Sequence, residues 1–206
     1  MSRLLKSGVF SDCEVKCDGK TWKLHKSILC IRSGYFNSCL TNGWPEGKTG
    51  CVEITLFTKE QMDWIISYIY TGKFDFDRHY NNKTFLHTAV QLWTLGDYFL
   101  VRNLCDDVEC RLSAFIPRSL NNAILRGFQL DAQDWLNAGR LIYTDFNVVD
   151  SKHVLKAEFL NLTLGKTWAR KLNLRMPEFK TLCQSHPKFG NDCMVKLVDD
   201  GISKLQ

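Results

Sequence analysis

Apolar and polar residues alternate at the start of the chain. In the segment from Phe10 to Cys17 the apolar residues Cys13, Val15 and Cys17 alternate with polar ones, and the alternation returns from Lys20 to Leu24. Asp18-Gly19, between the two runs, is a common two-residue hairpin turn. We therefore predict an antiparallel hairpin. Val52, Ile54 and Leu56 alternate with polar residues in the same way and predict a third strand.

Helical spacing of apolar residues predicts short helices after the hairpin, from His25 and from Ser33. Residues 41–50 hold three glycines and a proline, and we predict an irregular loop there. Thr58 and Gln61 form a capping box that begins a longer helix, which we expect to end at Thr71-Gly72. Two further helices are predicted, over residues 84–99 and 101–112.

The second half of the chain has only helical patterns. Its apolar stripes are Trp135, Ala138 and Ile142; Leu155, Phe159 and Leu162; Leu164, Trp168 and Leu172; and Met194, Leu197, Val198 and Ile202. Pro177 and Pro187 stand where a first helical position would suit them. Pro117 is expected to mark the boundary, so we divide the chain into an α+β domain, residues 1–112, and an all-helical region, residues 113–206.

Composition excludes several classes of protein. The 206 residues are 45% hydrophobic and 24% charged, values typical of a folded globular chain. No apolar run reaches the ~18 residues of a membrane-spanning helix, and the N-terminus has no apolar stretch typical of a signal peptide. With nine cysteines, an odd number, we expect reduced thiols and a location in the cytoplasm or nucleus.

The charge distribution does not favour nucleic acid as a partner. Residues 1–112 carry 14 basic and 13 acidic side chains, and residues 113–206 carry 13 and 9. A basic run at residues 166–175 includes Trp168 and has two interpretations, a nucleic-acid surface or the solvated face of an amphipathic helix. We favour the helix and expect neither a nucleic-acid nor a membrane partner.

Candidate reaction chemistry is sparse. Gly47-Lys48-Thr49 and Gly165-Lys166-Thr167 lack the earlier glycine of a phosphate-binding loop. Cys183, His186 and Cys193 are too few and too widely spaced for structural zinc. We expect no catalytic residue, no cofactor and no metal. His25 is expected to be a core histidine with its hydrogen bonds satisfied.

Four segments in order resemble the BTB/POZ family across residues 9–112. They are Phe10–Asp12, His25–Leu29, Ser33–Phe36 and Tyr68–Gly72. The helical remainder resembles the extension that follows BTB domains (BACK-like) and is similar to the tail of fungal BTB proteins. The resemblance implies a BTB/POZ fold, a small mixed sheet capped by helices, and a protein-interaction module without an active site.

The resemblance also implies partners. Many BTB proteins are substrate adaptors for cullin-type ubiquitin ligases, with a hydrophobic residue, any residue and a glutamate after the second short helix. Trp44-Pro45-Glu46 falls at that place, so Trp44 and Glu46 are the candidate cullin-binding residues. The glycines around them suggest a mobile loop that presents Trp44. The alternative is that Trp44 folds back and closes the loop over the third strand.

BTB domains commonly form homodimers, so the resemblance implies that this chain self-associates. The expected interface residues are Leu4, Leu5, Val9, Phe10, Tyr35 and Phe36. Asp12 and Lys26 match a charged pair that lines the groove of dimeric BTB transcription factors. The alternative is that this pair fixes the hairpin to the following helix.

The resulting hypothesis is a self-associating adaptor that brings an unknown recruited protein to a cullin-type ligase. The runner-up is a dimerising scaffold or transcriptional cofactor that never binds a cullin. An enzyme would need a cleft constellation that the sequence lacks.

Overall fold

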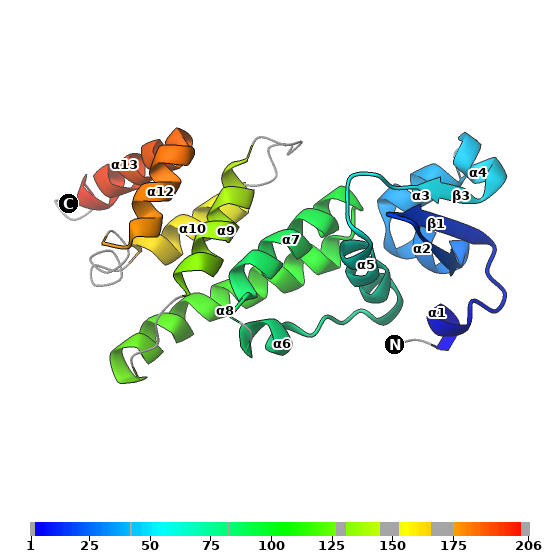
Figure 1. Ribbon diagram of the computed structural model, residues 1–206, viewed down its shortest axis with the longest axis horizontal. Helices are drawn as coiled ribbons and strands as arrows, with labels where there is room; N and C mark the ends of the chain where they lie inside the picture. Colours follow the sequence, from blue (N-terminus) through cyan, green and yellow to red (C-terminus); the bar gives the residue numbers. More distant parts are fainter. Residues whose placement is uncertain are drawn as a thin grey trace. The chain divides into compact units, whose positions relative to one another are not determined.

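The computed structural model describes residues 3–41, 43–81, 83–126, 131–144, 153–165 and 175–202 (Figure 1). The chain forms two compact units. The first comprises residues 1–76 and 91–108, and the second comprises residues 77–90 and 109–206. The unit boundaries fall inside three helices, α6 (Phe76–Asn81), α7 (Phe85–Tyr98) and α8 (Arg102–Arg126).

The first unit is built on a three-stranded sheet of order β2-β1-β3. The predicted hairpin is confirmed: β1 (Cys13–Cys17) pairs antiparallel with β2 (Lys20–Leu24), and Cys13 lies opposite Leu24. The third strand, β3 (Cys51–Glu53), pairs parallel with β1 in the register Val15 to Val52. It is shorter than predicted, and Leu56 lies beyond it as an exposed residue.

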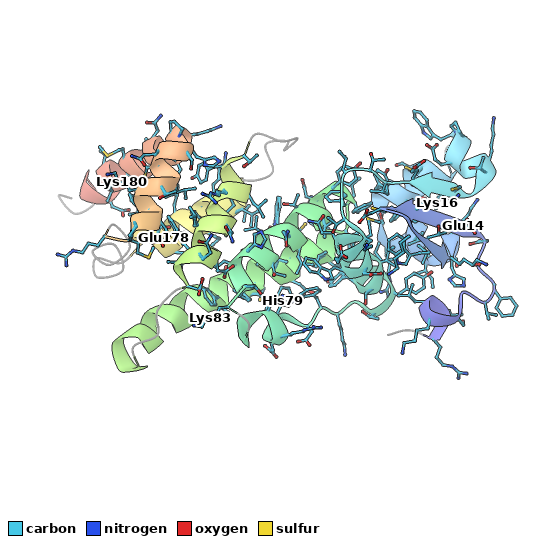
Figure 2. The ribbon with its side chains drawn as sticks, in the orientation of Figure 1. Glu14, Lys16, His79, Lys83, Glu178 and Lys180 are labelled. Carbon is cyan, nitrogen blue, oxygen red and sulfur yellow. The ribbon has the colours of Figure 1, made fainter. Side chains whose placement is uncertain are left out.

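One face of this sheet is buried and the other is polar. Val15, Leu24 and Val52 lie on the buried face, because strand side chains alternate between the two faces. Glu14 and Lys16 alternate with these positions along β1 and are labelled in Figure 2. The buried face fixes the register, because a slip of one residue would place charged side chains in the core.

Five helices accompany the sheet in the first unit. They are α1 (Arg3–Ser7), α2 (Lys26–Arg32), α3 (Gly34–Thr41), α4 (Pro45–Thr49) and α5 (Lys59–Thr71). The predicted capping box begins α5: Thr58 accepts a hydrogen bond from the Gln61 backbone, and the Gln61 side chain accepts one from the Thr58 backbone. Gly72, in a left-handed conformation (φ 65°), ends the helix as predicted.

The core of the first unit lies between the helices and the sheet. Met62, Ile65 and Ile69 form the buried stripe of α5. The Phe36 ring stacks on Phe99 with the ring centroids 5.4 Å apart. This core positions the beginnings of α2 and α3, where three of the predicted interaction residues lie: Lys26, Tyr35 and Phe36.

The described residues of the second unit form helices and short connections, with no strand among them. It holds most of α6 (Phe76–Asn81), the beginning of α7, the end of α8, α9 (Ala132–Tyr143), α10 (His153–Leu164), α12 (Pro177–Ser185) and α13 (Pro187–Ile202). Trp135 is fully buried at its centre and stacks on Phe159, with ring centroids 5.1 Å apart. The indole N–H of Trp135 donates a hydrogen bond of 3.1 Å to Thr163 Oγ1, so the polar atom of this core residue is satisfied.

Pro177 and Pro187 are the first residues of α12 and α13, as predicted. Two other predictions are wrong. The segment 41–50 is not irregular, because Pro45–Thr49 form α4. The helix predicted over residues 101–112 is longer than expected, because α8 runs from Arg102 to Arg126 and includes Pro117. A proline removes one intrahelical hydrogen bond, and the helix continues on both sides of it.

The second wrong prediction concerns the buried side of α13. The expected stripe places Met194 and Val198 against the core, but both are exposed. Phe189 and Cys193 are buried instead. The remaining stripe, at Trp168 and Leu172, lies outside the described residues, as does most of the basic run at 166–175. Among the described helices, none is long and apolar enough to cross a membrane.

Candidate interaction surfaces

The predicted cullin-binding residues form the beginning of α4. Trp44 is the N-cap residue in an extended conformation, and Pro45 occupies the first helical position, which its fixed φ suits. Gly50 closes the helix in a left-handed conformation, and its N–H donates a 2.7 Å hydrogen bond to the Glu46 carbonyl. The Trp44 side chain is 61% exposed. It therefore does not fold back over the third strand.

Two contacts hold α4 against the preceding elements. The Lys26 ammonium donates a hydrogen bond of 3.2 Å to the Gly47 carbonyl. Gly47 itself lies against α3, because a Cβ at this position would stand 3.1 Å from the Leu40 carbonyl oxygen. The residue after Glu46 is thus required to be small. These contacts hold the turn that presents Trp44, and the segment is a short helix in place of the expected loop.

Glu46 lies half-buried beside α3. Burial raises the pKa of the Cys39 thiol, and the Glu46 carboxylate acts in the same direction. Trp44 and Glu46 thus differ in environment: the indole faces solvent, whereas the carboxylate is partly shielded by the domain.

Asp12 and Lys26 meet, but not as the expected pair of opposite charges. The Asp12 carboxylate accepts a hydrogen bond of 2.7 Å from the backbone N–H of Lys26, the first residue of α2. The Lys26 ammonium is directed to Gly47 instead. The contact therefore caps a helix N-terminus, where a carboxylate is favoured by unpaired amides and by the helix dipole. It ties the hairpin to the following helix, which agrees with the structural alternative.

His25 is a buried histidine with both ring nitrogens satisfied, as predicted. Nε2 lies 2.8 Å from the Val9 carbonyl, which can only accept, so Nε2 carries the proton. Tyr70 Oη accepts from the His25 backbone N–H at 3.0 Å and lies 2.8 Å from Nδ1, to which it donates. These bonds anchor the N-terminal segment to α5.

The N-terminal segment exposes apolar side chains. Leu4 and Val9 are exposed, Leu5 is half-buried, and Phe10 is 88% exposed. Phe10 also has a positive φ of 62°, which is uncommon for an aromatic residue. The hydrogen bonds at its neighbours Val9 and Asp12 hold the chain in this conformation. The surface formed by Leu4, Val9 and Phe10 is called the N-terminal surface below.

The other two expected interface residues lie in the core. Tyr35 is half-buried among the rings of Phe36, Tyr98 and Phe99, with centroid distances of 5.2 to 5.4 Å. Phe36 has 0% exposure. The Phe36 side chain thus supports the fold and offers no surface to a partner in this conformation.

Sequence reasoning missed a groove in the first unit. It measures about 840 Å³ and is lined by the end of α2, the end of α5 and the beginning of α8. Exposed Ile31 and Leu100 stand at its rim. The Arg32 guanidinium donates to the Ile69 carbonyl at 2.9 Å and so caps the end of α5. One feature of the sequence could have indicated this groove: Ile31 is apolar, although it does not lie on the buried side of α2.

The described residues hold no cluster of three or more histidine, cysteine or acidic side chains that could bind a metal. Cys183 is half-buried, and His186 Nδ1 lies 2.9 Å from the hydroxyl of its neighbour Ser185. Gly47-Lys48-Thr49 lies in the last turn of α4, away from the helix beginning that a phosphate-binding loop requires.

Comparisons with known proteins identify the first half of the chain. A family model described as the BTB/POZ domain matches residues 1–113. TD and POZ domain-containing protein 4 of Mus musculus is 28% identical over 111 residues, which are 54% of this chain and 29% of that protein. Kelch-like protein 24 of Homo sapiens is 33% identical over 67 residues, 32% of this chain and 11% of that protein.

Among solved structures, the BTB domain of zebrafish PATZ1 matches 54% of this chain and 83% of its own length, with 20% identity and a TM-score of 0.44. The chain spans less than a third of the mouse relative and about a ninth of the human one. The likeness of the helical remainder to fungal proteins stays a prediction. The family model covers more than half of the sequence, and the chain therefore belongs to the BTB/POZ family of protein-interaction domains.

Proposed function

We propose that this protein is a self-associating adaptor that connects a recruited protein to a cullin-type ubiquitin ligase. The observation that carries the proposal is the exposed Trp44 at the N-terminus of α4, followed by Pro45 and Glu46. The human relative named above is a Kelch-like protein, which is consistent with adaptor work. No catalytic reaction is assigned to the chain.

Trp44 has the features of a binding hot spot. Tryptophan is the residue type most enriched among hot spots, because its large ring buries much area at small entropic cost. The ring is already exposed, and the fixed φ of Pro45 and the cap at Gly50 order the backbone beneath it. Binding therefore requires little ordering of this segment, which leaves more of the contact energy for affinity.

The experiment compares Trp44→Ala with the wild type in two measurements. Calorimetric titration with the N-terminal domain of a cullin measures affinity, and thermal unfolding measures stability. A hot-spot truncation commonly costs ~2 kcal/mol, so we expect binding to weaken roughly 30-fold. The melting temperature should stay unchanged, because the indole faces solvent.

Leu56→Ala is the matched control. Leu56 is exposed to a similar extent (60%) in the same unit, but outside α4. It should leave cullin affinity within about twofold of the wild type. If both variants weaken binding equally, the contact is not specific to α4. If the wild type fails to bind any cullin tested, the scaffold or transcriptional-cofactor function replaces the adaptor function.

We assign self-association to the N-terminal surface. Its apolar side chains are solvent-exposed, and a two-fold pair would bury the same surface from both copies. Phe10→Asp tests this directly, because it introduces two like charges into such a pair. The change also suits the backbone, since aspartate tolerates positive φ better than phenylalanine. Light scattering should give at least the mass of two chains for the wild type, and a lower average mass for the variant.

A further inference from the structure

In the second half of α13, the inward side carries charged residues and the outward side carries apolar ones, the reverse of the usual arrangement. Phe189 and Cys193 lie on the inward side and are buried, and Phe189 contacts the ring of Trp135. Further along the same side, Lys196 and Asp200 form an ion pair of 3.7 Å and are half-buried. Lys196 and Asp200 are thus turned toward the second unit.

The outward side of the same segment is apolar. Met194, Val195 and Val198 are 62%, 60% and 54% exposed. Residues three and four apart lie on one side of a helix, so the three side chains form one continuous patch, called the α13 stripe below. The described residues of the second unit leave this stripe uncovered.

Two opposite charges flank the α13 stripe. Lys188 precedes it and Asp199 follows it, and both are exposed. Their spacing of eleven positions is close to three helical turns. Both therefore lie on the same flank, one at each end. Neither side chain has a salt-bridge partner among the described residues.

We propose that the α13 stripe binds the α13 stripe of a second copy of this chain, with the two helices antiparallel. A two-fold axis through the middle of the stripe places each flank of α13 beside the same flank of the other copy. Because the helices are antiparallel, the beginning of one flank lies beside the end of the other. Lys188 then faces Asp199 of the other copy, and Asp199 faces its Lys188. The midpoint of the two positions falls beside Met194. The axis that pairs the charges therefore places Met194 and Val195 of the two copies across from one another, whereas Val198 faces the beginning of α13 in the other copy.

This arrangement is self-complementary in both charge and apolarity, which is why a second copy is the occupant that the stripe fits. A polar partner helix would leave the apolar side chains without a match, and a parallel copy would place Lys188 against Lys188. The stripe is separate from α4 and from the N-terminal surface in sequence. A chain with two different self-associating surfaces can form assemblies larger than a dimer.

The test is a charge reversal followed by a charge swap in the full-length chain. Each variant is made in both the wild-type and the Phe10→Asp background, so that the N-terminal surface is scored separately. Lys188→Glu places a carboxylate opposite Asp199 of the other copy, and the two-fold axis repeats this repulsive contact, so each dimer contains it twice. We expect the dissociation constant from sedimentation equilibrium to rise at least about tenfold in each background. The double variant Lys188→Glu/Asp199→Lys restores opposite charges and should return the constant to within about threefold.

Val195→Glu, in the centre of the stripe, should weaken association at least as much. Val154→Glu is the matched control, because Val154 is an exposed apolar residue of α10 in the same unit. Circular dichroism checks that each variant is folded. The proposal is overturned if Lys188→Glu leaves association unchanged in both backgrounds, or if the swap fails to restore it. An effect of Phe10→Asp alone bears only on the N-terminal surface, and cullin affinity is read separately through Trp44→Ala.

Discussion

The Asp12 carboxylate accepts a hydrogen bond of 2.7 Å from the backbone amide of Lys26. This single contact joins the residue before β1 to the first turn of α2, across fourteen positions of sequence. His25, the N-cap residue of α2, makes no side-chain cap of its own. Asp12 therefore supplies from a distance the acceptor that most helices obtain from their N-cap residue.

Asp12→Ala should lower the free energy of unfolding by about 1 kcal/mol, the typical effect of removing a helix cap. Asp12→Asn should lose much less, because an amide oxygen still accepts from the Lys26 N–H and asparagine caps helices as well as aspartate. Urea unfolding of the three proteins measures the difference. If Asp12→Asn is as destabilising as Asp12→Ala, charge pairing matters more than capping.

Gly139 in α9 lies where this helix packs closely against two core side chains of the second unit. A Cβ at this position would stand 2.5 Å from Leu182 Cδ2 and 2.8 Å from Phe159 Cζ. We expect Gly139→Ala to destabilise the protein by about 1–3 kcal/mol, because these core side chains must shift. Thermal and urea unfolding measure the change.

Gly201→Ala in α13 is the matched control for Gly139→Ala. Its added Cβ would meet no atom within 4 Å, and alanine favours helix over glycine by up to about 1 kcal/mol. The same chemical change should therefore have opposite signs at the two positions. A loss of stability at Gly201, or none at Gly139, would contradict the packing described for α9.

The sequence predicted those elements whose first and last residues are typical turn or capping residues. The hairpin followed from alternation and Asp18-Gly19, and α5 followed from the Thr58–Gln61 box and Gly72. Short α4 was missed because its glycines were interpreted as loop signals. Gly50 is in fact the left-handed residue that ends the helix, and Pro45 is suited to begin it.

The candidate surfaces were harder to predict, because sequence spacing identifies an apolar side but not what covers it. The spacing of Met194 and Val198 predicted burial, whereas Phe189 supplies the core contact and those two side chains remain exposed. Phe36 was expected at an interface and is instead enclosed by the aromatic core. The position of Trp44 could be predicted, but its exposure depends on how α4 is held by Lys26 and Gly47.

The thiols should differ widely in reactivity. Burial raises the pKa of Cys13 and of Cys193 to about 12, so few of these groups are thiolates at neutral pH. Cys105 is buried, and Cys30 and Cys39 are half-buried with raised pKa. Titration of the native protein with a thiol reagent should give a fast phase well below the nine cysteines of the sequence.

Cys110 is exposed and should react in the fast phase. Cys110→Ser should therefore remove one equivalent from that phase, and denaturant should make all remaining thiols reactive. Rapid reaction of all nine cysteines in the native protein would contradict the burial of Cys13, Cys105 and Cys193.

Asp134 joins two helices of the second unit. Its carboxylate accepts hydrogen bonds from the backbone amides of Leu86 at 2.8 Å and His87 at 2.9 Å, at the beginning of α7. Burial raises the pKa of Asp134 above 3.8, the two hydrogen bonds oppose this in part, and the neighbouring Asp131 carboxylate adds to the rise. The protonated form is thus favoured more in the folded protein than in the unfolded chain.

This direction sets the pH dependence. A raised pKa contributes stability that is fully present below the unfolded value of 3.8 and is lost as pH rises through the folded pKa. Asp134→Asn cannot titrate, although its amide oxygen can still accept a hydrogen bond from α7. The free energy of unfolding of the wild type minus that of Asp134→Asn should therefore be largest at acid pH and fall as the carboxyl ionises, levelling off toward neutrality. Urea unfolding of both proteins from about pH 3 to pH 7 measures this difference and cancels the other carboxyl groups. A difference that grows with pH would show that the α7 amides stabilise the Asp134 anion by more than burial destabilises it.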